Sequence, residues 1–125
     1  MIRGGIVVPL VAIAGIHYLS SLEPAELAAP VLPVPHADKG VHAVLFALLL
    51  CSFRAWRGWR RTPVEWLPGA CAACLVVAGG DEWHQSFVPG RQSDVADFLA
   101  DAVGIGLAAG VWAHWSRARA HRRLR

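Results

Sequence analysis

Four stretches of apolar residues divide this chain, and three of them become polar at the same end. The stretches cover residues 4–22, 40–53, 66–80 and 102–116. The first has 19 residues and can cross a bilayer as a helix, whereas the others, of about 14 or 15 residues, would also fit a buried helix of a soluble protein. The pattern predicts an all-α protein with one domain over residues 1–125 and helices at approximately 4–20, 38–56, 63–83 and 94–115.

The distribution of charge favours a membrane protein over a soluble one. The chain is 55% hydrophobic and only 17% charged. Lys39 and Arg91 lie in the first and third connections, and the other ten basic residues lie at the two termini and in the second connection: Arg3, Arg54, Arg57, Arg60, Arg61, Arg117, Arg119, Arg122, Arg123 and Arg125. This positive-inside pattern predicts a multi-pass, four-helix transmembrane bundle with both termini cytoplasmic.

The same charge pattern argues against two other hypotheses, a cleaved signal peptide and a nucleic-acid partner. A cleaved signal peptide at the N-terminus would leave three helices and spoil the alternation of charge, so we do not favour it. The net charge of +3 does not indicate a nucleic-acid partner, because the arginines are accounted for by topology. The partners expected are therefore membrane lipids.

Local signals predict several helix boundaries and contacts. Residues 62–65, Thr-Pro-Val-Glu, form a capping box with proline at the first helical position, and Pro68 should kink the helix that follows. Ser93 is the expected N-cap of the fourth helix. Close backbone packing is expected at 106–110, Gly-x-x-x-Gly, and at the glycine pair 79–80.

Acidic residues gather at the end where the second, third and fourth helices become polar. Asp94, Asp97 and Asp101 are spaced i, i+3, i+7 and share one face of the fourth helix. At 1.5 Å per residue, Asp101 should lie roughly 10 Å below Asp94, beyond simple helix-end capping. The end as a whole holds six acids against the two bases Lys39 and Arg91: Asp38, Asp81, Glu82, Asp94, Asp97 and Asp101.

Carboxylates gathered at one end of a membrane bundle need a compensating positive charge or hydrogen-bond donors. Glu82 lies at the C-terminal end of its helix, where the dipole disfavours negative charge, so we expect Arg91, Lys39 or a histidine as its partner. The net acidity predicts a retained proton, a bound divalent cation, or both. A purely structural polar plug between helices is the alternative. Ionisable groups inside a membrane usually serve a function.

These residues are the ones by which the chain resembles the VanZ-like family of small bacterial membrane proteins. The family's first block, Asp-Lys-x-x-His-x-x-x-Phe, corresponds here to Asp38, Lys39, His42 and Phe46. Its second block corresponds to Glu82, Gln85, Phe87, Pro89, Gly90 and Arg91, followed by Asp97, Asp101 and Gly104. The family usually has asparagine where this chain has Asp101. The match spans approximately residues 18–110.

The resemblance implies a protein of the bacterial cytoplasmic membrane, in a family linked to resistance to the glycopeptide teicoplanin. A site facing away from the cytoplasm would bind an envelope component, such as a precursor or a glycopeptide-related ligand. The candidate ligand-binding residues are Asp38, Lys39, His42, Glu82, Gln85, Arg91, Asp97 and Asp101. Lys39 and Arg91 would contact anionic groups.

Two other functions are open. The first is a membrane-embedded hydrolase or transferase acting on a lipid-linked head group, with Glu82 or Asp97 as general base and His42 as acid, and with a divalent metal as an optional cofactor. The second is a non-catalytic partner of envelope proteins, in a homo- or hetero-oligomer, that packs through its glycine-rich faces.

The predicted topology can be tested with membrane-impermeant thiol reagents after the native cysteines have been replaced. In intact cells, a cysteine introduced at position 91 should be labelled, because the third connection faces outward. Cysteines introduced at positions 61 and 120 should be spared until the cells are permeabilised. Labelling of 61 and 120 with protection of 91 would place the bundle upside down.

Overall fold

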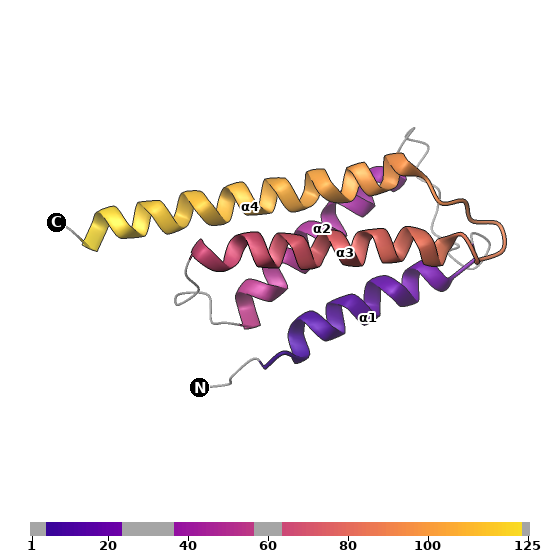
Figure 1. Cartoon of the computed structure of the whole chain (residues 1–125), viewed down its shortest axis with the longest axis horizontal. Helices are drawn as coiled ribbons and strands as arrows, with labels where there is room; N and C mark the ends of the chain where they lie inside the picture. Colours follow the sequence, from indigo (N-terminus) through magenta and orange to yellow (C-terminus); the bar gives the residue numbers. More distant parts are fainter. Residues whose placement is uncertain (1–4, 24–36, 57–63, 124–125) are drawn as a thin grey trace.

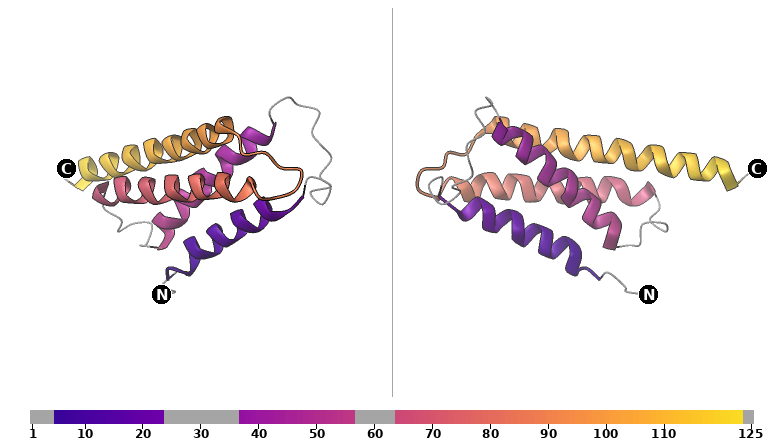
Figure 2. Two further views of the ribbon diagram at one scale, coloured as in Figure 1. Left: turned by 45° about the vertical axis from the view of Figure 1, so that its right-hand side comes forward. Right: turned by 180° about the vertical axis from the view of Figure 1, so that it is seen from behind.

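The structure, a computed structural model, describes residues 5–23, 37–56 and 64–123 as an antiparallel bundle of helices (Figure 1). Its elements are α1 (Val7–Ser21), α2 (Ala37–Trp56), the 3-10 turn η1 (Val64–Trp66), α3 (Leu67–Gln85) and α4 (Val95–Arg123). The described residues contain no strand, so the all-α, four-helix prediction is confirmed. The first turn of α1 and the last turn of α4 lie toward the same end of the bundle (Figures 1 and 2).

The two ends of the bundle differ in chemistry. One end, which we call the polar end, brings together the last turns of α1 and α3 with the first turns of α2 and α4. The opposite end carries Arg54 and the arginine-rich last turns of α4. The prediction that the acidic ends of the helices meet on one side is therefore correct.

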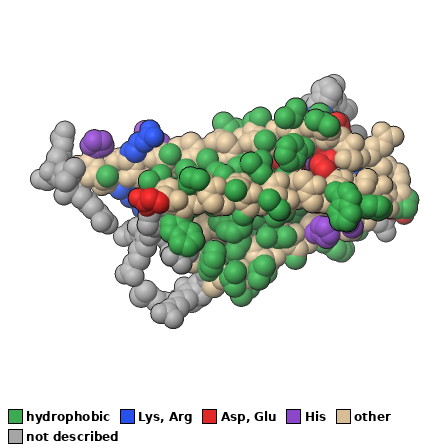
Figure 3. All heavy atoms as spheres, viewed as in Figure 1, with side chains coloured by type: hydrophobic (Ala, Val, Ile, Leu, Met, Phe, Trp, Pro, Cys, Tyr) green, Lys and Arg blue, Asp and Glu red, His purple; other side chains and the backbone are tan. Residues whose placement is uncertain are grey.

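Apolar side chains are spread over the face of the bundle that Figure 3 shows. Several charged side chains are buried inside the bundle. Val44, Val76 and Val103 are among the exposed side chains, whereas Asp81, Glu82 and Asp101 are buried. Such an arrangement suits surroundings of hydrocarbon rather than water. By length and composition, α2, α4 and the segment Val64–Gln85 can each cross a membrane.

Helices α1 and α4 differ in length from the predictions. The 15 residues of α1 span only about 22 Å, against a hydrocarbon core of about 30 Å, so α1 is shorter than the other three. The 29 residues of α4 span about 43 Å, because the helix that we predicted to end near residue 115 continues through the basic segment to Arg123. The last turns of α4 therefore carry Arg117 and Arg119 beyond the apolar part of the helix.

The start of α3 also departs from expectation. The predicted cap, Thr62 with Pro63, lies outside the described residues. Regular α-helix begins only at Leu67, after η1, so Pro68 does not kink an established helix. It occupies the first turn of α3, where the N–H group that proline lacks would have no intrahelical partner.

The closest helix packing is between α2 and α4, and it depends on Gly104. A Cβ atom at Gly104 would lie 2.8 Å from Ala43 Cα and would collide with the Ala43 carbonyl. The glycines that we expected at close contacts do not have this role. Added Cβ atoms at Gly79, Gly80, Gly106 and Gly110 would meet nothing within 4 Å.

We therefore expect Gly104→Ala to destabilise the bundle by about 1–3 kcal/mol, because the methyl group forces two backbones apart. The loss should appear as a lower midpoint in thermal unfolding of the detergent-solubilised protein. Gly106→Ala, two residues away in the same helix, is the matched control and should not lower the midpoint, since alanine favours helix. Equal midpoints for the two variants would contradict the packing argument.

Candidate functional site

The first turn of α4 is capped by Asp94 and not by Ser93, the N-cap that we predicted. Asp94 Oδ1 accepts a hydrogen bond of 2.8 Å from the backbone N–H of Ala96, two residues on. This bond, together with the hydrogen bond from Lys39, lowers the pKa of Asp94. Asp94 is therefore a carboxylate at the positive end of the helix dipole.

Glu82 bridges the end of α3 and the start of α4. Its Oε2 accepts hydrogen bonds from the Asp94 backbone N–H at 2.9 Å and from the Ser93 hydroxyl at 3.3 Å. The side chain is buried. We expected Arg91, Lys39 or a histidine as its partner, and the structure shows the N-terminus of α4 instead. The dipole of α4 thus compensates a carboxylate that the dipole of α3 disfavours.

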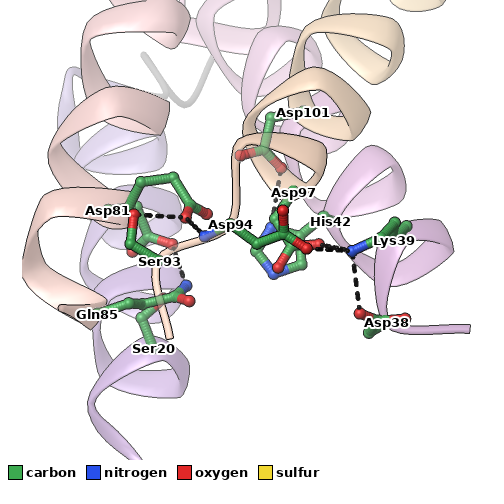
Figure 4. Close-up of polar contacts among 11 residues, drawn as sticks. Ser20, Asp38, Lys39, His42, Asp81, Gln85, Ser93, Asp94, Asp97 and Asp101 are labelled. Carbon is green, nitrogen blue, oxygen red and sulfur yellow. Dashed lines mark hydrogen bonds and ion pairs between the residues drawn. The ribbon is translucent and has the colours of Figure 1, made fainter. Parts of the chain in front are cut away.

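Lys39 joins α2 to the start of α4 through Asp94 and Asp97, and it also contacts Asp38 of its own helix (Figure 4). Its Nζ lies 2.7 Å from Asp97 Oδ1, 3.0 Å from Asp94 Oδ2 and 3.4 Å from Asp38 Oδ2. Charge-assisted contacts of this length hold the two helices in register. The positive charge of Lys39 is therefore already matched by carboxylates of the chain itself.

One turn further along both helices, His42 of α2 faces Asp101 of α4. His42 Nδ1 and Asp101 Oδ1 are 3.1 Å apart (Figure 4). Asp101 is fully buried, with an exposed fraction of 0%. The i, i+3, i+7 spacing predicted that the three aspartates share a face, and the contacts to Lys39 and His42 agree with that face lying against α2.

A second group of polar contacts joins α3 to α1. The Gln85 amide donates to Asp81 Oδ2 at 2.9 Å and lies 3.5 Å from the Ser20 hydroxyl. The rings of His17 and His84 stack with centroids 4.1 Å apart, and His17 Nδ1 is 4.0 Å from Asp81 Oδ1. Ser20 was missed by sequence reasoning, because a lone serine near a helix end gives no signal of its burial.

Arg91 closes the end of α1. Its Nε donates to the Leu22 carbonyl and its Nη2 to the Leu19 carbonyl, each at 3.2 Å. The Leu19 carbonyl, in the last turn of α1, also accepts the Leu22 backbone N–H at 3.3 Å, and the Leu22 carbonyl lies just beyond the helix. Arg91 thus supplies side-chain donors to carbonyls at a helix end. The remaining guanidinium donors leave Arg91 able to contact a second group.

A cleft of about 300 Å³ lies between α1, α2 and α3 at the polar end. Its apolar wall consists of Ile16, Leu19, Val41, Leu45 and Phe46. Its polar lining consists of Ser20, Asp38, His42, Asp81, Gln85 and Arg91. Of the predicted ligand-binding residues, the cleft thus gathers Asp38, His42, Gln85 and Arg91. Lys39, Glu82, Asp97 and Asp101 do not line it.

Three buried carboxylate oxygens at the polar end have no hydrogen-bond partner within the described part of the chain. They are Asp81 Oδ1, Glu82 Oε1 and Asp101 Oδ2. Two of these residues, Glu82 and Asp101, form a group with His42 in which one potential ligand atom from each lies within 4.8 Å of the others. These three residue types are the usual nitrogen and oxygen ligands of divalent transition metals.

One of three comparisons with known proteins found a match. A search of the curated proteins found no match, and a search of the solved structures found none either. The family model described as VanZ/LLP1 matches residues 5–116, which include every residue of the polar end discussed above. The chain therefore belongs to the VanZ/LLP1 family, as a membrane protein of that family with a buried, acidic polar end.

Proposed function

We propose that this protein binds an amphipathic component of the bacterial cell envelope in the cleft at its polar end. The observation that carries the proposal is the lining of the cleft, which is apolar on one wall and ionisable on the other. An acyl or prenyl chain fits against Leu19, Val41 and Leu45, and a polar head group fits against His42, Asp81 and Arg91. Both termini would lie in the cytoplasm of a bacterial inner-membrane protein, with the polar end facing outward.

Charge favours a particular kind of head group. Asp38 and Asp81 line the cleft with a single fixed cation, Arg91, and Lys39 is matched by Asp94 and Asp97. A bare phosphate would meet net negative charge here. A head group with hydroxyl, amide or amine donors beside one anionic group suits the lining better, since the carboxylates accept and Arg91 donates. Lipid-linked sugars and peptides of the envelope belong to this class.

A second candidate function is hydrolysis or group transfer on the same head group. His42 lines the cleft and contacts Asp101, which suits a histidine that moves protons. Glu82 is a better candidate base than Asp97, because Glu82 Oε1 has no partner among the described residues and Asp97 Oδ1 binds Lys39. The Ser93 hydroxyl, which we predicted only as an N-cap, lies 3.3 Å from Glu82 Oε2 and is a candidate nucleophile; neither residue lines the cleft itself.

A third function, as a partner of other envelope proteins, would use the outer glycine faces. Gly79, Gly80, Gly106 and Gly110 are exposed in the single chain and leave room for a close-packed helix of another chain. This role would not need the cleft or the buried carboxylates.

Ligand binding can be tested by partly filling the cleft. Leu19 lines the cleft and is 40% exposed, so Leu19→Trp adds bulk there without disturbing the core. We expect the affinity for a polyprenyl monophosphate carrying an N-acetylated sugar, whose phosphodiester has a single negative charge, to fall about tenfold, equivalent to roughly 1.4 kcal/mol, as measured by native mass spectrometry. Val103→Trp, on the exposed face of α4, is the control and should bind as the original chain does. Equal affinities for both variants would contradict the proposal.

Cellular assays separate a role of the site from a role of the outer faces. If the site is responsible, Glu82→Gln and Asp97→Asn should abolish a phenotype such as reduced susceptibility to teicoplanin, and Gly106→Leu should preserve it. Quantitative immunoblotting of the membrane fraction controls for the amount of each variant. The reverse pattern, loss with Gly106→Leu alone, would support the partner function and contradict the proposal.

A further inference from the structure

We infer that His42, Glu82 and Asp101 form a binding site for one divalent transition-metal cation, with Zn²⁺ as the best fit. The three residues come from three different helices, α2, α3 and α4, and converge at the centre of the polar end. One potential ligand atom from each lies within 4.8 Å of the other two. The inference does not depend on the identity of any ligand in the cleft.

The unpartnered oxygens provide independent support. Asp101 has an exposed fraction of 0% and Glu82 of 7%, yet Asp101 Oδ2 and Glu82 Oε1 accept no hydrogen bond from any described residue. Leaving a buried carboxylate oxygen without a donor is unfavourable, because the oxygen loses its hydration and gains no partner. A cation between the two residues would satisfy both oxygens at once.

The local charge leads to the same conclusion. Within the described residues, no lysine or arginine forms an ion pair with Glu82 or Asp101. Lys39, the nearest base along α2, contacts Asp38, Asp94 and Asp97 instead. Two ionised carboxylates with a neutral imidazole carry a charge of −2, which one divalent cation balances. Buried charges are tolerated when they are paired or bind a metal.

The ligand types select the class of metal. Imidazole nitrogen beside two carboxylates suits Zn²⁺ or Mn²⁺ better than Mg²⁺ or Ca²⁺, which prefer oxygen alone, and Zn²⁺ binds such sites more tightly than Mn²⁺. Around Zn²⁺, with bonds of about 2.0–2.1 Å, tetrahedral ligand atoms lie roughly 3.4 Å apart. Small rotations of these side chains would close the present spacing. His42 also lines the cleft, so an open coordination position could face a bound head group.

Metal content of the full-length protein tests the inference. The chain would be purified in detergent, stripped with EDTA, exposed to ZnCl₂ and passed over a desalting column. We expect inductively coupled plasma mass spectrometry to find about one Zn²⁺ per chain, and MgCl₂ at the same concentration to leave no stoichiometric metal. Asp101→Asn and Glu82→Gln should each lower the zinc affinity at least tenfold by isothermal titration calorimetry, which corresponds to about 1.4 kcal/mol.

Asp81→Asn is the matched control, because Asp81 is also buried at the polar end and also has an unpartnered oxygen, but lies outside the group. This variant should retain zinc. Substoichiometric zinc in the original chain, or equal losses in Asp81→Asn and Asp101→Asn, would overturn the inference.

A measurement on the unmodified protein covers the case in which a variant fails to fold. Zinc-edge X-ray absorption should show one imidazole nitrogen with oxygen ligands and no sulfur. A sulfur signal would assign the zinc to Cys51, Cys71 or Cys74 and overturn the inference. The Leu19→Trp variant should bind zinc as the original chain does, because Leu19 lies outside the three-residue group. A result against ligand binding in the cleft is therefore distinguishable from a result against the zinc site.

Discussion

The hydrogen bonds between the Glu82 carboxylate and the first residues of α4 are the interaction on which the polar end depends. Glu82 projects from the last turn of α3, where the helix dipole disfavours a negative charge, and accepts the Asp94 N–H and the Ser93 hydroxyl. The Glu82 carboxylate therefore supplies an acceptor for the N–H groups at the start of α4. In return it receives hydrogen-bond donors that the C-terminal end of α3 does not have. The turn between the two helices is fixed as a result, and the aspartates of α4 are set against α2.

The distance between α2 and α4 then decides which side chains can meet. Gly104 lets the backbones approach at Ala43, the residue that follows His42. Asp101 lies three residues before Gly104 on α4, so the same approach brings Asp101 within 3.1 Å of His42. Because apolar side chains cover the outside of the bundle, the interior is the low-cost place for these ionisable groups in a membrane. The close contact between Gly104 and Ala43 thus determines both the packing of α2 against α4 and the pairing of His42 with Asp101.

Much of this arrangement could be predicted from the sequence, and the failures have physical causes. The periodicity and charge indicated the four helices and the meeting of the acidic ends, because both depend on composition over many residues. The partner of Glu82 was predicted wrongly because a backbone N–H of another helix carries no sequence signal. The glycines were misassigned because spacing alone does not show which face of α4 packs: Gly104 contacts α2, whereas Gly106 points outward. The pattern of apolar residues does not predict the extension of α4 to Arg123, because the apolar stretch ends at residue 116 and the basic residues beyond it are polar.

The polar end consists of two layers with different electrostatics. In the layer nearer the helix ends, Lys39 pairs with Asp38, Asp94 and Asp97, and of these carboxylates Asp38 and Asp94 are exposed. In the deeper layer, Asp101 and Glu82 face His42 without a lysine or arginine among the described residues. Where the family usually has a neutral asparagine, this chain places the Asp101 carboxyl, which raises the demand for positive charge where water is scarcest. A histidine proton can supply one positive charge there, a proton retained on a carboxyl would remove one negative charge, and a divalent cation would balance both carboxylates while leaving the imidazole neutral.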